Sequence, residues 1–262
     1  MAHRRSRGIA MATGPVAAGR IPEEDAPQFP YEDLGDLEKE AIEDALRLAW
    51  ARLPAAAQRQ GIPLEQVGET PITRLLRDEL DKIRRDESRP IPDFSDDTFE
   101  HIPENENVPD FTGRPFDENQ KQPDLVFRPR FVPRYVARVS TYGLFVECKI
   151  IHKSEDHLGP GNYCESGLLR FVDGRYAWTM PSGLMVAYVR NGKDLITCLV
   201  PHLDRAKHRE TYHVKALPAL RVGTSERTPA VYVSTHARPT VKVGERSSGD
   251  IEIAHLWLQV GS

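Results

Sequence analysis

Long apolar stretches are absent from this chain of 262 residues. It contains no apolar run of about eighteen residues, the length that a membrane-spanning helix needs. The first residues, MAHRRSRGIAMATG, are basic but lack the apolar stretch of a secretory signal. We therefore expect a soluble, cytoplasmic protein that does not associate with a membrane.

Cysteine is also scarce. Cys148, Cys164 and Cys198 are an odd number, and no two of them form a Cys-x-x-Cys pair. This pattern argues against a disulfide framework and against a zinc ribbon. A mixed zinc site of Cys148, His152, His157 and Cys164 is a weaker alternative, because Cys148 is expected to face the core.

Charge is unevenly distributed along the chain, whose net charge is −4. Residues 1–119 carry 15 Lys and Arg against 26 Asp and Glu, a net of −11, while residues 120–262 carry 20 against 13, a net of +7. A positive field over the second half would attract a polyanion such as a nucleic acid. The alternative interpretation is that the two halves balance each other within one compact fold.

Apolar periodicity predicts two helices in the acidic half. The first spans 36–53 and is expected to end at Pro54. The second spans 71–86, and the following stretch contains a candidate short strand near 98–102. The apolar stripe of the second helix consists of Ile72, Leu75, Leu76, Leu80 and Ile83.

The sequence pattern of the basic half predicts a series of strands with helices between them. The clearest strand is LFVECKII, and two late strands are expected at AVYVSTH and IEIAHLWLQV. LFVECKII is strand 144–151, and the other predicted elements are strand 123–127, helix 163–178 and strand 184–189.

One domain over 36–262 is the expected organisation, preceded by a flexible tail over 1–35 that lacks apolar periodicity. We expect a core over about 69–190, interrupted by an acidic insertion over about 89–122. A β extension over about 193–262 completes the chain.

Two charged residues interrupt the most apolar strand. Side chains alternate along a strand, so Glu147 and Lys149 share one face of LFVECKII. Burying both is costly unless they pair, bind a metal or line a site. A neighbouring strand at 123–127 would bring Asp124 beside Glu147, and the backbone carbonyl of Cys148 would complete a hard oxygen site for Mg²⁺ or Mn²⁺. With Lys149 orienting a water or stabilising charge, these groups suit phosphodiester hydrolysis.

These residues resemble a known motif. Pro123-Asp124 followed by Glu147-Cys148-Lys149 is similar to the signature of the PD-(D/E)XK, or restriction-endonuclease-like, nuclease superfamily. The resemblance implies an α/β fold with a central mixed four-stranded sheet flanked by helices, here with extra C-terminal strands. The pattern of the later strands is also loosely similar to that of bacterial defence-system nucleases.

The same resemblance implies another acid in the site. Members of the superfamily usually contribute a glutamate from the first core helix, and Glu69 at the helix start fits that role best, with Glu79 as the alternative. The implied catalytic residues are therefore Asp124, Glu147, Lys149 and Glu69.

The motif is short, and the sequence leaves another interpretation open. Pro-Asp occurs at 92–93, 109–110 and 123–124, but only the last precedes a strand-like run and the Glu-x-Lys strand. The alternative is a strand at the surface, on which Glu147 and Lys149 form an ordinary ion pair.

Several basic residues of the second half are candidates for contacts with nucleic acid. Arg170 and Arg175 follow the catalytic strand on the predicted helix, where phosphate contacts are reasonable. The remaining candidates are Lys153, His236 and Arg238. His255 lies inside an apolar strand, so we interpret it as a hydrogen-bonded core histidine.

These patterns favour a Mg²⁺-dependent or Mn²⁺-dependent endonuclease that acts on DNA rather than RNA, in restriction or anti-phage defence. We expect it to work as a homodimer or with a partner subunit of a defence complex. The alternative is a catalytically inactive nuclease-like subunit that binds nucleic acid or a protein partner in a larger complex.

Overall fold

The computed structural model describes residues 29–100, 122–152, 158–190, 192–222, 227–243 and 245–260. Most of the expected N-terminal tail and residues 101–121 of the acidic insertion lie outside these ranges. Across the described part of the chain, no helix combines the length and apolarity that crossing a bilayer requires.

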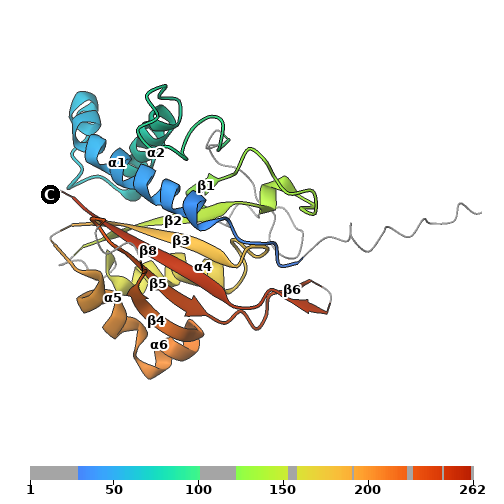
Figure 1. Ribbon diagram of the computed structural model, residues 1–262. Coiled ribbons are helices and arrows are strands. Elements are labelled where there is room, and N and C mark those ends of the chain that lie inside the picture. The colour runs from blue at the N-terminus through green and yellow to red at the C-terminus, as the bar shows by residue number, and fades with distance from the viewer. Residues whose placement is uncertain are drawn as a thin grey trace, which may run out of the picture.

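A mixed six-stranded sheet forms the centre of the molecule (Figure 1). Its strand order is β1-β2-β3-β8-β5-β4; the neighbours β2, β3 and β8 run parallel, and the other pairs are antiparallel. The strands are β1 Leu125–Phe127, β2 Leu144–Ile151, β3 Ser182–Val189, β4 Val214–Leu220, β5 Val231–His236 and β8 Ile251–Gln259. The expected α/β class is confirmed, and the C-terminal strands continue the central sheet, with β8 directly beside β3.

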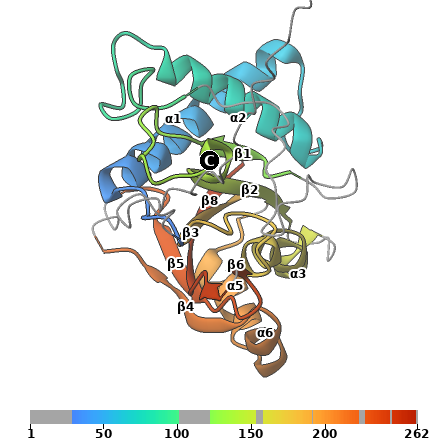
Figure 2. The same cartoon turned by 90° about the vertical axis from the view of Figure 1, so that its right-hand side faces the viewer.

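Helices cover both faces of the sheet. In Figure 2, α1 and α2 lie on one side, and α3, α5 and α6 lie on the other. The helices are α1 Asp36–Gln60, α2 Glu69–Arg84, α3 Pro160–Tyr163, α4 Leu169–Val172, α5 Leu195–Leu203 and α6 Ala206–Thr211. A π-helical turn, Cys164–Leu168, joins α3 to α4. A separate small hairpin consists of β6 Lys242–Val243 and β7 Arg246–Ser247.

The prediction that Pro54 ends the first helix is wrong. Proline removes one backbone hydrogen bond from a helix, but Leu53, Ala56 and Ala57 are all buried in the core. Their packing and the alanine-rich sequence keep the segment helical. The helix ends instead at Gly61, whose φ of 66° is the left-handed conformation that glycine accepts most readily.

Two other predicted elements differ from the structure. Of the candidate strand near 98–102, only 98–100 are described, and they form one isolated bridge between Phe99 and Pro129, because Thr98 bonds the backbone of Ser95 in a turn. The helix predicted over 163–178 ends earlier, at Val172, and the chain then turns through left-handed residues, including Gly174 with φ 77°.

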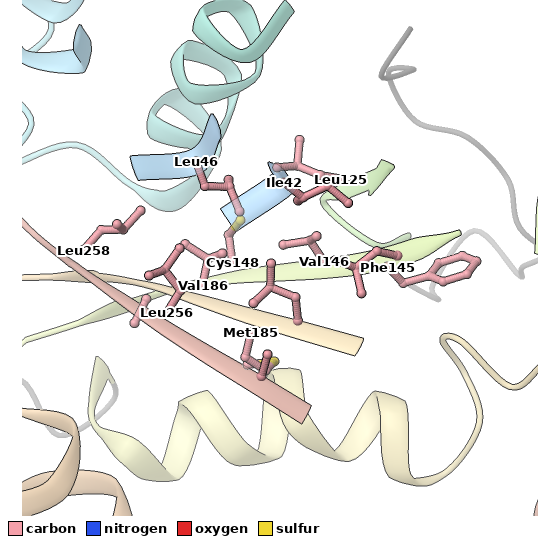
Figure 3. Close-up of a cluster of buried hydrophobic side chains, with 14 of the residues drawn as sticks. Ile42, Leu46, Leu125, Phe145, Val146, Cys148, Met185, Val186, Leu256 and Leu258 are labelled. Carbon is pink, nitrogen blue, oxygen red and sulfur yellow. The ribbon is translucent and has the colours of Figure 1, made fainter. Parts of the chain in front are cut away.

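The central strands are buried along their whole length, as expected for parallel strands covered on both faces. All eight residues of β2 and all eight of β3 are buried. Figure 3 shows Cys148 of β2 directed toward Ile42 and Leu46 of α1, while Met185 of β3 is directed toward the helix on the opposite face. Glu147 and Lys149 therefore lie in a strand that has no exposed face.

Gly143 lies immediately before β2, where the chain needs a backbone conformation that glycine adopts readily. Its φ is 139°, and a Cβ built there would lie 2.5 Å from the carbonyl oxygen of Phe127 at the end of β1. We predict that Gly143→Ala destabilises the protein by about 2 kcal/mol, because the new methyl group must displace backbone of the paired strand. Chemical denaturation measures this change.

Gly161→Ala is the matched control, because a Cβ at Gly161 would make only an ordinary 3.9 Å contact with His202 and the residue is not left-handed. Equal stability of the two variants would contradict the role given to Gly143.

Candidate active site

Pairing of β1 with β2 brings two distant acids together. The register pairs Leu125 with Val146 and Val126 with Phe145, so one step further places Asp124 opposite Glu147. Residues directly opposite in a sheet share a face. Oδ2 of Asp124 also accepts a 2.7 Å hydrogen bond from the backbone nitrogen of Cys148, which fixes the carboxylate beside the middle of β2.

Lys149 lies among the oxygen atoms of this site. Its Nζ is 2.6 Å from Oε1 of Glu147, 3.0 Å from Oε1 of Glu69 and 2.7 Å from the carbonyl oxygen of Cys148. Glu69 is the first residue of α2, so this ammonium group joins the sheet to a helix.

Of the two candidate helix acids, the structure brings Glu69 and not Glu79 to Lys149. Glu79 lies ten residues further along α2, which is about 15 Å of helix. It is buried and pairs with Lys82 at 2.6 Å. Glu79 is therefore placed as a structural ion-pair residue.

Arg170 approaches Glu147 from the other face of the site. Its Nη1 donates to Oε1 of Glu147 at 2.6 Å and to the hydroxyl of Tyr176 at 3.0 Å. The guanidinium also lies 5.6 Å from the centroid of the Tyr176 ring. Arg170 was expected at a nucleic-acid surface, but it is only 8% exposed and holds a carboxylate instead.

The π-helical turn brings the helix close to Glu147. A Cβ added to Gly167 would lie 3.5 Å from Cγ of Glu147 and 2.5 Å from Cε of Met185. Such turns change the register of a helix by one residue and frequently occur at functional sites. Here the turn lies immediately before α4, the helix that carries Arg170.

The charges of this cluster do not balance. Three carboxylates, those of Asp124, Glu147 and Glu69, are opposed by two cations, Lys149 and Arg170. Within the described part of the chain, Oε2 of Glu147 is buried without a hydrogen-bond partner. The cluster therefore carries one excess negative charge, which a proton or a metal cation would neutralise.

Burial and this excess charge shift the pKa values of the cluster. Burial, followed by the charge of Asp124, raises the pKa of Glu147 to about 8, although Lys149 and Arg170 oppose the shift. Burial also raises the pKa of Asp124. Burial alone would lower the pKa of Lys149, but the carboxylates of Glu147, Glu69 and Asp124 outweigh it and raise this pKa. Lys149 is therefore an ammonium donor at neutral pH.

The donor set fits a hard divalent cation in its chemistry. Asp124, Glu147 and the Cys148 carbonyl supply oxygen ligands of the kind that Mg²⁺ and Mn²⁺ prefer, and Oε2 of Glu147 has no other partner in the described structure. Among the described residues, no group of three or more His, Cys, Asp or Glu side chains is arranged to hold a metal. A site of two carboxylates and one carbonyl uses only two such side chains.

Three other candidate residues lie away from this cluster. Arg175 is 38% exposed at its side chain and pairs with Asp173 at 2.6 Å. Arg238 is 1% exposed and donates to backbone carbonyls, including those of Ala177 and Met180. His236 is fully buried. Arg238 and His236 therefore support the core and are not positioned to contact a nucleic acid. Lys153 lies outside the described residues.

His236 and His255 belong to one chain of buried hydrogen bonds. The carbonyl oxygen of Tyr212 can only accept, so His236 donates from Nδ1 at 2.7 Å and accepts from Ser234 through Nε2 at 2.8 Å. His255 then donates to Ser234 through Nε2 and accepts from Tyr163 through Nδ1, both at 2.8 Å. Burial lowers the pKa of His236 to about 4 and that of His255 to about 3, so both are neutral core residues, as expected for His255.

The alternative zinc site is not assembled in the described structure. Cys148 points toward α1 (Figure 3), whereas Cys164 belongs to the helical segment on the opposite face of the sheet. His157 lies outside the described residues.

Tyr176 is the residue of this site that the sequence did not identify. It is 1% exposed, packs edge-on against Phe171 and accepts the hydrogen bond of Arg170. The sequence placed it inside a longer predicted helix, where an aromatic residue is usually part of the core. The early end of α4 instead returns the ring to Arg170.

Comparisons of this chain with protein-family models, with curated proteins and with solved structures each found no match.

Proposed function

We propose that this protein is a metal-dependent nuclease that hydrolyses phosphodiester bonds in DNA. The observation that carries the proposal is the juxtaposition of Asp124 and Glu147 across adjacent strands, with Lys149 bonded to Glu147 in the same buried cluster. The excess negative charge of this cluster favours the binding of a cation. The resemblance of the motif to the PD-(D/E)XK signature supports the same function and suggests a role in bacterial defence.

Each residue then has a separate task. Asp124, Glu147 and the carbonyl oxygen of Cys148 would hold Mg²⁺ or Mn²⁺, which supplies Lewis acidity and lowers the pKa of a bound water. Lys149, protonated and supported by Glu69, would donate hydrogen bonds to the negative charge that develops on the scissile phosphate. Arg170 and Tyr176 hold the carboxylate of Glu147 in position.

One observation favours the alternative, a nuclease-like subunit that does not cut. The Lys149 ammonium already bonds two of the three proposed metal ligands, Glu147 and the Cys148 carbonyl. A cluster of this kind can be a purely structural ion-pair network. Metal binding separates the two functions.

Removal of either carboxylate charge should abolish cleavage. We predict that Asp124→Asn and Glu147→Gln each lower the rate of DNA hydrolysis by about 100-fold or more, because each loses a direct metal ligand. The rate is measured on plasmid, linear and single-stranded DNA and on RNA with Mg²⁺ or Mn²⁺. Both replacements keep the shape of the side chain and reduce the excess charge, so folding should be preserved.

Glu165→Gln is the matched control, because Glu165 is an exposed carboxylate on the adjacent π-helical turn. It should cut at the wild-type rate. Absence of hydrolysis by the wild type on every substrate, or full activity of Asp124→Asn, would contradict the proposal.

Metal affinity should depend on pH in a defined direction. A cation competes with the proton of the cluster, and the pKa of Glu147 is raised to about 8, so affinity should increase from pH 6 to 8 and level off above that range. Calorimetry in two buffers of different ionisation enthalpy should detect the release of about one proton per ion at pH 7. A metal affinity that is independent of pH would contradict the competition with the Glu147 proton, and no metal binding at all would support the non-cutting alternative.

A further inference from the structure

The connection between β1 and β2 has an unusual composition. Residues 125–146 contain four arginines and no lysine, aspartate or glutamate. This basic segment lies directly between the two acids of the candidate site, Asp124 and Glu147. In Figure 1 its middle part is the lime-coloured segment that extends from the sheet to the right of β1 and β2.

Two of the four arginines hold the connection in a defined shape. Arg128 is 5% exposed and donates to the carbonyl oxygens of Val139 at 3.3 Å and Ser140 at 3.1 Å. Arg130 donates through Nε to the carbonyl oxygen of Asp96 at 2.6 Å. These bonds attach both halves of the connection to neighbouring backbone, so the side chains between them are presented on a fixed framework.

Three large side chains between these attachments are exposed to solvent, while Val132, Tyr135 and Val136 pack against the core. Phe131 is 82% exposed, far more than a buried aromatic residue of the core. Arg134 and Arg138 are both exposed, and neither guanidinium group has a hydrogen-bond or ion-pair partner among the described residues. Within the described structure, this surface therefore presents two unpaired guanidinium groups and one exposed aromatic ring that are available to bind a ligand.

We propose that Phe131, Arg134 and Arg138 form a docking surface for single-stranded nucleic acid. The inference rests on the proposed nuclease function and specifies the form of its substrate. Guanidinium groups bind phosphate oxygens through paired hydrogen bonds, which explains the use of arginine and no lysine. An exposed ring stacks on the face of a base, and that face is free only where the base is unpaired.

The position of this surface relative to the site agrees with an extended ligand. The connection enters β2 at Leu144, and Lys149 lies five residues later, about 17 Å along the strand. A nucleic-acid strand bound at Phe131 therefore has to extend along the β1-β2 hairpin to reach Asp124 and Glu147.

The test is a binding measurement in EDTA, where metal-dependent hydrolysis cannot occur. Fluorescence anisotropy with labelled oligo(dT), oligo(rU) and a duplex of the same length compares the wild type with Phe131→Ala and with Arg134→Gln/Arg138→Gln. The double variant should bind single strands at least about tenfold more weakly, and its slope of log affinity against log salt should fall by about 1.4, or 0.7 per lost phosphate contact. Phe131→Ala should lose about tenfold on single strands and less than about twofold on the duplex.

Arg59→Gln/Arg205→Gln is the matched control, since it removes the same charge from exposed positions on α1 and before α6. Thermal unfolding of each variant verifies the fold. Equal losses for the control and the Arg134/Arg138 variant, an unchanged affinity of Phe131→Ala, or tighter binding of the duplex would each overturn the docking surface.

These experiments distinguish failure of the docking surface from failure of the proposed nuclease function. A protein that binds single strands through Phe131 but never cleaves them contradicts the proposed nuclease function alone. A protein that cleaves DNA while its Phe131 and arginine variants bind like the wild type contradicts the docking surface alone.

Discussion

The antiparallel pairing of β1 with β2 is the constraint on which the candidate site depends. β1 has only three residues, yet its register places Asp124 opposite Glu147, and the hydrogen bond from the Cys148 backbone fixes that position. A negative charge buried in this way must be compensated. The nearby ammonium and guanidinium groups supply most of the compensation, and the remaining charge makes the cluster suited to bind a proton or a cation.

The sequence was most informative where one physical requirement dominates. Strand β2 was predicted at its observed bounds, because a buried parallel strand needs an uninterrupted apolar run, and the two charges within it indicated the candidate site. The clustering of Asp124, Glu147, Lys149 and Glu69 was expected from side-chain alternation and from the resemblance to the PD-(D/E)XK motif. Only the structure distinguishes Glu69 from Glu79 as the helix carboxylate that reaches Lys149, since this depends on where α2 begins relative to the sheet.

Where tertiary packing overrides local preference, the sequence was less informative. Pro54 lies inside α1 because buried neighbours stabilise that segment. His236 and Arg238 are polar residues near a strand end, which resembles a binding surface in sequence, but both are buried and hydrogen-bonded within the core. Tyr176 joined the site through a turn after α4 that no periodic pattern indicates.

The most direct test of the central claim is a crystal structure of the protein grown with Mn²⁺, using its anomalous scattering to locate the ion. The account predicts an anomalous peak bonded to the carboxylates of Asp124 and Glu147 and to the carbonyl oxygen of Cys148, at about 2.1–2.3 Å. Lys149 should then have released the Cys148 carbonyl. A structure at saturating Mn²⁺ with no peak at these oxygens, and with Lys149 still bonded to Glu147 and Cys148, would contradict it.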